Sequence, residues 1–264
     1  GDLVKTASYK DGEITFQTSD TYKEGNAVIA AKDASGTILW SWHIWFTDQP
    51  QEHVYYNNAG TMMDRNLGAT SATPGEVGAL GLFYQWGRKD PFLGSSSISS
   101  GVLALSTGTW KTTSGGTARL AEKNPMTFYT SMSLPDGYWQ SEKTIYDPCP
   151  SGWRVPDGGS DGVWKKALGL SSSDIGSSLC DKTNKGMNFS GKFGEASTIW
   201  YPASGWRYHS DGRLGNVGFS GHDWSASPDS NSYSLHLHFT IDGDIYPSRR
   251  LERANGYSVR CCKE

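Results

Sequence analysis

The chain has 264 residues, which is enough for one large domain or two small ones. Its 11 Trp, 13 Tyr and 9 Phe can build a packed core and exclude a disordered chain, and the lack of any run of about 18 apolar residues excludes a transmembrane helix. The 24 basic and 27 acidic residues give a net charge of −3 without a basic arm, so we expect no nucleic-acid partner. Thirty-two glycines argue against a mainly helical protein.

An aromatic β-hairpin is the first strong pattern. Residues 27–32 and 37–47 are β-prone and flank the turn sequence Asp33-Ala34-Ser35-Gly36, and Glu13–Thr18 predicts an earlier strand. Alternation in the second hairpin strand places Ile38, Trp40, Trp42, Ile44 and Phe46 on one face and Leu39, His43 and Trp45 on the other. Such a strand could be an exposed carbohydrate platform or could be covered on both faces, and burial statistics favour the covered strand.

Two helices are predicted. The clearer one begins at the capping box Thr73-Pro74-Gly75-Glu76, continues with an apolar stripe and meets stop signals at Gly87 and Pro91. Its stripe consists of Val77, Leu80 and Tyr84. A weaker helix is predicted over Val163–Leu168, and the Ser-, Thr- and Gly-rich stretch 94–116 predicts a surface loop.

Short strands dominate the prediction for the C-terminal part, with strand-like pieces over 200–206, 217–225, 232–241 and 257–262. Strict alternation predicts that Leu235, Leu237, Phe239 and Ile241 face the core and that Ser234, His236, His238 and Thr240 face outward. Asp242-Gly243-Asp244 then predicts a hairpin turn.

The four cysteines, Cys149, Cys180, Cys261 and Cys262, lack the spacing of a structural zinc site. Whether they form disulfides depends on the compartment. The chain begins Gly1-Asp2-Leu3 without Met, which we interpret as a processed or truncated chain. The missing signal peptide therefore does not argue for the cytosol.

Five motifs occur in order along the chain: Gly60-Thr-Met-Met-Asp-Arg-Asn-Leu-Gly68, Tyr84-Gln-Trp-Gly-Arg-Lys-Asp-Pro-Phe92, Asp147-Pro-Cys-Pro-Ser-Gly-Trp-Arg-Val-Pro156, Trp224-Ser225 and Gly256-Tyr-Ser-Val-Arg-Cys261. With these motifs, residues 40–264 resemble the major paralogous domain of gut Bacteroidales surface proteins, many of which are described as fimbrillin-like or cell-adhesion proteins. The resemblance implies an α+β, C-type-lectin-like fold with short antiparallel strands, one clear helix, one weaker helix and long loops. The formylglycine-generating enzymes and the variable proteins of diversity-generating retroelements share such a fold.

The resemblance also implies a domain organisation. We expect an N-terminal β segment over 1–36, which could be the end of a preceding module, and a lectin-like domain over 37–264. A variable ligand-binding region would span 200–262. Because the two termini of such a domain lie side by side, the strands over 40–46 and 257–262 are expected to be neighbours.

The cysteine positions carry a further implication of the resemblance. Cys149 and Cys261 match the family's two recurrent cysteine positions, which implies a disulfide between residues 112 positions apart. Cys180 and Cys262 could pair as well, or Cys180 could be a small buried residue. The sequence leaves both alternatives open.

The main functional expectation is a non-enzymatic recognition or adhesion protein at the cell surface, extracellular and anchored to the outer membrane. It would bind a host or microbial glycan or a surface protein, could contact other pilus or surface-protein subunits, and would need no cofactor. The expected binding residues are polar and aromatic positions interleaved with an apolar framework, a composition typical of adaptable binding surfaces. They are Tyr208, His209, Asp211, Arg213, Asn216, His222, Asp223, Asn231, His236, His238, Tyr246, Arg249, Arg250 and Arg253.

Three alternatives remain at this point. A retroelement-diversified receptor is one, because residues 253–261 resemble the fixed motif that ends such variable regions. A metal-dependent lectin is the second: no calcium-binding tripeptide accompanies Trp224, but His236 and His238 could bind zinc with His222 or Asp223. An enzyme like the formylglycine-generating ones is the third, and it needs two reactive cysteines close together. We expect neither a metal site nor catalysis.

Overall fold

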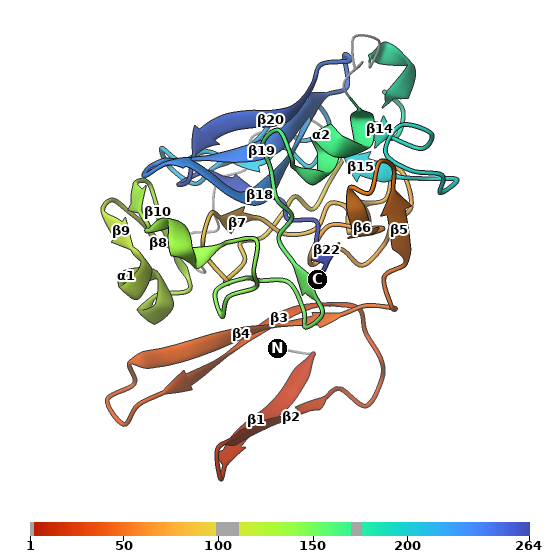
Figure 1. Ribbon diagram of the computed structural model, residues 1–264. Helices are drawn as coiled ribbons and strands as arrows, with labels where there is room; N and C mark the ends of the chain where they lie inside the picture. The colour runs from red at the N-terminus through yellow and green to blue at the C-terminus, as the bar shows by residue number, and fades with distance from the viewer. Residues whose placement is uncertain (1–2, 99–110, 170–175) are drawn as a thin grey trace.

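The computed structural model describes residues 3–98, 111–169 and 176–264, and it has the α+β composition that the sequence predicts (Figure 1). Strands predominate, and the described residues contain two short α-helices, α1 (Ala118–Lys123) and α2 (Val163–Leu168). No helix in this part of the chain has the length and apolarity needed to cross a bilayer. The predicted loop over 94–116 lies largely outside the described residues.

Two hairpins form the N-terminal part and lie together at the bottom of Figure 1. Strand β1 (Val4–Lys10) pairs with β2 (Glu13–Thr18), and β3 (Gly25–Lys32) pairs with β4 (Ile38–Phe46), each pair as a separate two-stranded sheet. The predicted hairpin is therefore confirmed. The expected domain boundary at 36/37 falls in the turn of the second hairpin, whose two strands pair along almost their whole length.

Strand β4 has side chains half-buried on both faces, as the alternation predicts. On the face toward the main body, Trp45 Nε1 donates to the Ala69 carbonyl at 2.9 Å and His43 Nδ1 lies 3.2 Å from the Tyr84 hydroxyl. The expected pairing with the C-terminal strand is wrong, because β4 pairs with β3 whereas β22 lies between β12 and β6. Among the described residues, side-chain contacts such as these join the hairpin to the main body.

The C-terminal strand instead belongs to an antiparallel sheet with the order β12-β22-β6-β5. A second sheet has the order β17-β16-β21-β7 and a third the order β13-β14-β15. Their strands are β5 (Glu52–Tyr55), β6 (Gly60–Met63), β7 (Tyr84–Gln85), β12 (Trp153–Arg154), β13 (Cys180–Asp181), β14 (Gly186–Asn188), β15 (Trp200–Pro202), β16 (Trp206–Arg207), β17 (Leu214–Gly215), β21 (Gly256–Tyr257) and β22 (Cys262–Lys263).

The longest described strand, β18, belongs to the sheet β18-β19-β20, drawn in blue at the top of Figure 1. These strands are β18 (Ser220–Ser230), β19 (Tyr233–Thr240) and β20 (Ile245–Glu252). The predicted turn at Asp242-Gly243-Asp244 joins β19 to β20, with the Thr240 amide donating to the Asp244 carbonyl at 2.9 Å. Two short parallel pairs complete the strands: β8 (Lys111–Thr113) with β10 (Thr127–Tyr129), and β9 (Gly116–Thr117) with β11 (Met132–Ser133).

Helix α2 has the predicted bounds, but the helix predicted after Thr73 is wrong. That segment forms only the single 3-10 turn η1 (Val77–Ala79). Gly75 and Gly81 adopt positive φ angles of 82° and 72°, which an α-helix does not allow. The capping residues therefore do not start an α-helix. The segment forms a glycine-rich loop instead, which buries Leu80 and leaves Val77 exposed. The other 3-10 turns in the described part of the chain are η2 (Asp136–Tyr138) and η4 (Ser177–Leu179).

The expected disulfide between Cys149 and Cys261 is present, with the two Cα atoms 5.9 Å apart. It joins the segment before β12 to the segment before β22, inside an aromatic core that includes Trp86, Trp139 and Trp224. Cys180 and Cys262 are free and lie at the second core. The proposed second disulfide does not form.

Candidate ligand-binding surface

The structure separates the fourteen expected binding residues by exposure. Some are exposed on loops and on the edge strand β20, others are half-buried, and several are enclosed. The exposed ones are Asp211, Arg213, Asn231, Tyr246, Arg249 and Arg250; the half-buried ones are Tyr208, His209 and Asn216; the buried ones are His222, Asp223, His236, His238 and Arg253.

The outward orientation predicted for His236 and His238 is wrong, because both are buried. Strand β19 lies in the middle of its sheet, with Leu237 and Phe239 packed in one core on one face. The histidine face is covered as well, since the Tyr257 ring lies 4.7 Å from the His236 ring. An alternating pattern leaves one face of a strand in solvent only when no other element packs on that face. Here a second layer of strands packs on the histidine face of β19.

Three imidazoles form what we call the histidine cluster: His222, His236 and His238. His222 on β18 is the cross-strand partner of His238 on β19, and their ring centroids are 4.5 Å apart. His222 Nδ1 lies 3.3 Å from His236 Nε2. Trp206 covers the cluster at 4.5 Å from the His222 ring. The cluster thus packs as a layer of aromatic rings beneath the surface.

The histidine cluster is uncharged at neutral pH. Burial lowers the pKa of His238 to about 4, and burial lowers the pKa values of His222 and His236 well below their usual range. The positive charge of Arg249 acts in the same direction on all three. No side-chain or backbone group among the described residues forms a hydrogen bond with His222 Nε2 or His236 Nδ1 by distance and angle. Within the described ranges, no group of three or more His, Cys, Asp or Glu side chains is arranged to hold a metal ion.

Two exposed residues of β20 rest on this cluster. The Tyr246 ring is 48% exposed and stacks on His238, with centroids 5.6 Å apart and planes 10° from parallel. Arg249 Nη1 lies 2.8 Å from His238 Nδ1, and its guanidinium lies 5.5 Å from the centre of the Tyr246 ring. Since a guanidinium only donates, Nδ1 accepts and the imidazole proton sits on Nε2. The buried histidine therefore orients a surface arginine.

A surface hollow of about 460 Å³ adjoins these two side chains. Its lining consists of Lys165, Tyr246, Pro247, Ser248 and Arg249. Lys165 is exposed in the last turn of α2, the helix that contacts β20. The hollow thus combines two cations, two hydroxyl groups and one aromatic ring. The sequence did not indicate Lys165 or Ser248, because only the packing of α2 beside β20 brings Lys165 to this strand.

Other expected binding residues have internal partners. Arg213 lies over the Tyr208 ring at 4.8 Å and pairs with Asp211 at 3.5 Å, whereas Arg250 pairs with Asp229 at 3.2 Å. The loop that carries Tyr208 reaches the histidine cluster through Trp206, whose ring lies 4.9 Å from the Tyr208 ring. The surfaces around Tyr246 and around Tyr208 therefore both rest on the buried rings of the histidine cluster and Trp206.

Arg253 has a structural role. Its side chain is fully buried, lies 4.0 Å from the centre of the Trp86 ring, and donates to the Leu134 carbonyl at 2.7 Å and to Ser234 Oγ at 2.9 Å. It also forms an ion pair with Asp136. A fully buried side chain with these partners is not available to a ligand.

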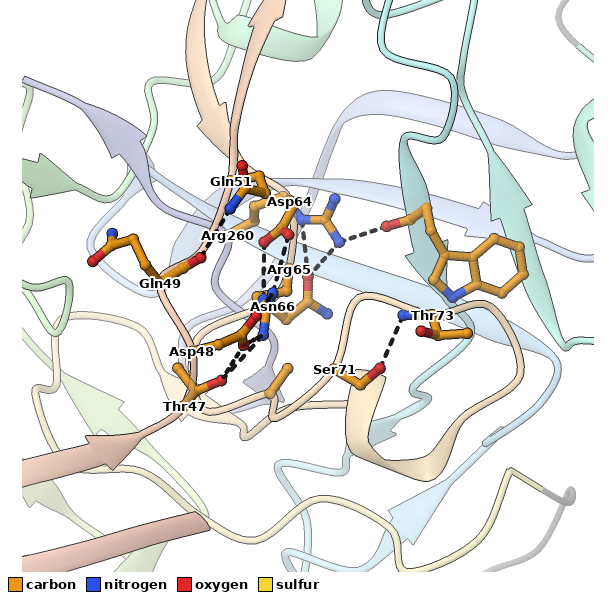
Figure 2. A network of polar contacts seen from close by, with 12 residues as sticks. Thr47, Asp48, Gln49, Gln51, Asp64, Arg65, Asn66, Ser71, Thr73 and Arg260 are labelled. Carbon is orange, nitrogen blue, oxygen red and sulfur yellow. Dashed lines mark hydrogen bonds and ion pairs between the residues drawn. The ribbon is translucent and has the colours of Figure 1, made fainter. Parts of the chain in front are cut away.

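Figure 2 shows a second polar network, which joins the motif over 60–68 to the closing motif over 256–261. Arg260 is fully buried, donates to Asn66 Oδ1 at 3.0 and 3.1 Å and lies 3.6 Å from the centre of the Tyr201 ring. Arg65 lies between Asp64 and Asp48 and bonds to both. These motif residues hold chain segments together and do not form an open site.

Asp223 lies on the opposite face of β18 from the histidine cluster and is buried. Burial raises the pKa of its carboxyl to about 7, while the charge of Arg260 opposes the rise. Its Oδ1 has no hydrogen-bond partner in the part of the chain that the structure describes. Asp223 is therefore separated from His236 and His238 by the strand itself, and the zinc set that would combine them does not assemble.

A tryptophan-lined cleft of about 650 Å³ lies where β4 faces the loop over 145–150. Trp40, Trp42 and Trp45 line it, which corresponds to the carbohydrate platform considered for this strand. Its charged groups have internal partners: Lys89 Nζ donates to the Ser41 carbonyl at 2.9 Å, and Asp147 accepts from two backbone amides at 2.8 Å. The cleft therefore offers a ligand mainly apolar surface.

The thiols are unsuited to chemistry like that of the formylglycine-generating enzymes. Cys261 is bonded to Cys149, and burial raises the pKa of the neighbouring Cys262 thiol to about 12. Burial also raises the pKa of Cys180. A thiol reacts as the thiolate, so both free cysteines are poor nucleophiles at neutral pH.

Comparison with known proteins does not identify a relative: no family model, no curated protein and no solved structure matches the chain.

Proposed function

We propose that this protein is a non-enzymatic recognition protein of the cell surface, with a C-type-lectin-like domain that binds a glycan or protein ligand. The motif order in the sequence supports the family and its fold. The short antiparallel strands, the long loops and the Cys149–Cys261 disulfide are compatible with them.

The single observation that carries this proposal is the surface formed by Tyr246 and Arg249 above the histidine cluster. Tyrosine and arginine are frequent anchors of binding surfaces, because tyrosine provides a large contact area at low entropic cost and arginine provides several donors. His238 holds both side chains from beneath, by ring stacking and by a hydrogen bond. A preorganised surface loses less freedom on binding, which favours affinity.

The contacts of the histidine cluster favour binding over catalysis. In the described part of the chain, the hydrogen bonds of these three side chains join them to one another and to Arg249, and none reaches a serine or cysteine. General-base catalysis of nucleophilic attack needs such a contact. Diversification by a retroelement would also have to spare the buried positions, because substitutions there disturb the core.

A glycan array and a screen of cell-surface proteins test the proposal. We expect at least one ligand to bind the wild-type protein, and Tyr246→Ala to reduce that binding by about tenfold or more. Tyr9→Ala is the matched control, since Tyr9 is 73% exposed on β1 in the N-terminal hairpin. Absence of any ligand, or equal binding by the two variants, would refute the proposal.

A further inference from the structure

We infer that the hollow beside β20 binds the anionic group of an acidic sugar, either a carboxylate or a sulfate. This inference rests on the proposed function and names the ligand class of the same surface. It is carried by the two cations that converge there, Arg249 and Lys165, and by the groups that hold Arg249 in place.

Arg249 is oriented but not neutralised. Its neighbours on the surface are paired, because Arg213 meets Asp211 and Arg250 meets Asp229. Arg249 instead donates to the neutral imidazole of His238, and within the described ranges no carboxylate lies within ion-pair distance of it. An imidazole acceptor fixes the guanidinium without cancelling its charge. The remaining N–H groups can then meet a carboxylate or sulfate in the two-pronged geometry that arginine favours.

Lys165 supplies the second positive charge from a different element. It is exposed in the last turn of α2, lines the same hollow and has no ion-pair partner among the residues that the structure describes. Asp244 is the carboxylate whose charge acts on His238, and it accepts a hydrogen bond from Thr240 Oγ1 at 3.2 Å. That hydrogen bond leaves the charge of Asp244 in place, but within the described ranges Asp244 forms no ion pair with Arg249 or Lys165, so two cations without an ion-pair partner line the hollow.

The remaining lining suits a sugar better than a bare anion. Tyr246 offers a half-exposed ring, against which the C–H face of a sugar can pack, and the Ser248 and Tyr246 hydroxyls can exchange hydrogen bonds with sugar hydroxyls. A volume of about 460 Å³ lies within the usual range for small-molecule sites. Charge selects the anionic group, and the ring and hydroxyls select the carbohydrate that carries it.

Calorimetric titration with four probes tests this inference: a glucuronate-containing tetrasaccharide, the same tetrasaccharide with its carboxyls reduced to alcohols, N-acetylglucosamine 6-sulfate and a glutamate-rich peptide. We expect the two acidic sugars to bind, and the reduced tetrasaccharide to bind about tenfold more weakly or worse. Raising the salt concentration from about 50 to about 500 mM should weaken the acidic sugars selectively, because it shortens the screening length.

Variants on two elements locate the site. Arg249→Gln and Lys165→Gln should each weaken the acidic sugars by about tenfold. Arg250→Gln is the matched control, because Arg250 lies on the same strand but pairs with Asp229. Lys165 is exposed, so its replacement keeps the test valid even if Arg249→Gln disturbs β20; thermal unfolding monitors both variants.

Three results would overturn the inference. Equal binding of the reduced tetrasaccharide, unchanged affinity in both Lys165→Gln and Arg249→Gln, or binding of the peptide alone would each exclude an acidic-sugar site. If a neutral glycan or a protein binds and Tyr246→Ala abolishes that binding, the inference fails while the proposed function stands. If no glycan or protein binds at all, both fail.

Discussion

Replacing His238 by glutamine is expected to make the protein less sensitive to acid. His238 has a pKa of about 4 in the folded protein and 6.5 as an unperturbed side chain. Above pH 6.5 the imidazole is neutral in both states and has no effect on the pH dependence. As the pH falls from 6.5 toward 4, the unfolded chain binds a proton that the folded protein excludes, so the free energy of unfolding decreases.

The magnitude follows from the width of this window. One group that binds a proton only in the unfolded state lowers the free energy of unfolding by about 1.4 kcal/mol per pH unit. Over the whole window from pH 6.5 to about 4, His238 therefore removes about 3 kcal/mol, and about 2 kcal/mol is already lost at pH 5. Glutamine does not titrate, and its Oε1 can still accept from Arg249.

Urea unfolding, followed by tryptophan fluorescence between pH 7.5 and pH 5, measures the difference between the two proteins. We expect the wild-type protein to lose about 2 kcal/mol more than His238→Gln over this range. His222 and His236 act in the same direction and Asp223 in the opposite one, but they are common to both proteins. Parallel pH profiles for the two proteins would refute the reasoning.

Three further predictions follow from the core. Reducing the Cys149–Cys261 disulfide, which spans 112 residues, should lower the free energy of unfolding by about 4–5 kcal/mol, and an unchanged urea midpoint in dithiothreitol would contradict this. Arg253→Met should cost about 1–3 kcal/mol in thermal or urea unfolding, because it leaves the buried Leu134 carbonyl and Ser234 hydroxyl without the guanidinium that donates to them, whereas its ion-pair partner Asp136 is 56% exposed and stays hydrated; a loss below about 0.5 kcal/mol would contradict this. Iodoacetamide should modify half-buried Cys180 before Cys262, whose thiol is buried; mass spectrometry would reveal the reverse order.

Local patterns predicted those features of the fold that depend on neighbouring residues. The hairpin of β3 and β4 follows from two β-prone runs around the turn Asp33-Ala34-Ser35-Gly36, and α2 has the predicted bounds. The helix expected after Thr73 shows the limit of the same approach. Its capping residues were compatible with a helix, but Gly75 and Gly81 also permit the left-handed backbone that the packed loop requires.

The candidate site depended on contacts between segments far apart in the chain. Sequence reasoning included Tyr246 and Arg249 among fourteen positions but could not separate them from His236 or Arg253, which have similar polarity and are buried. It did not include Lys165, which belongs to another element. Burial is decided by which layers cover a strand, and a single strand's alternation does not contain that information.

By itself, the sequence indicated the α+β composition, several strands of the C-terminal part but not β20, and, through its motifs, the disulfide between Cys149 and Cys261. Only the tertiary structure decided that a second layer of strands covers the histidine face and that Arg249 rests on His238, with no carboxylate partner among the described residues. The physical reason is that backbone conformation responds to nearby residues, whereas burial and charge compensation depend on segments that meet only when the chain has folded.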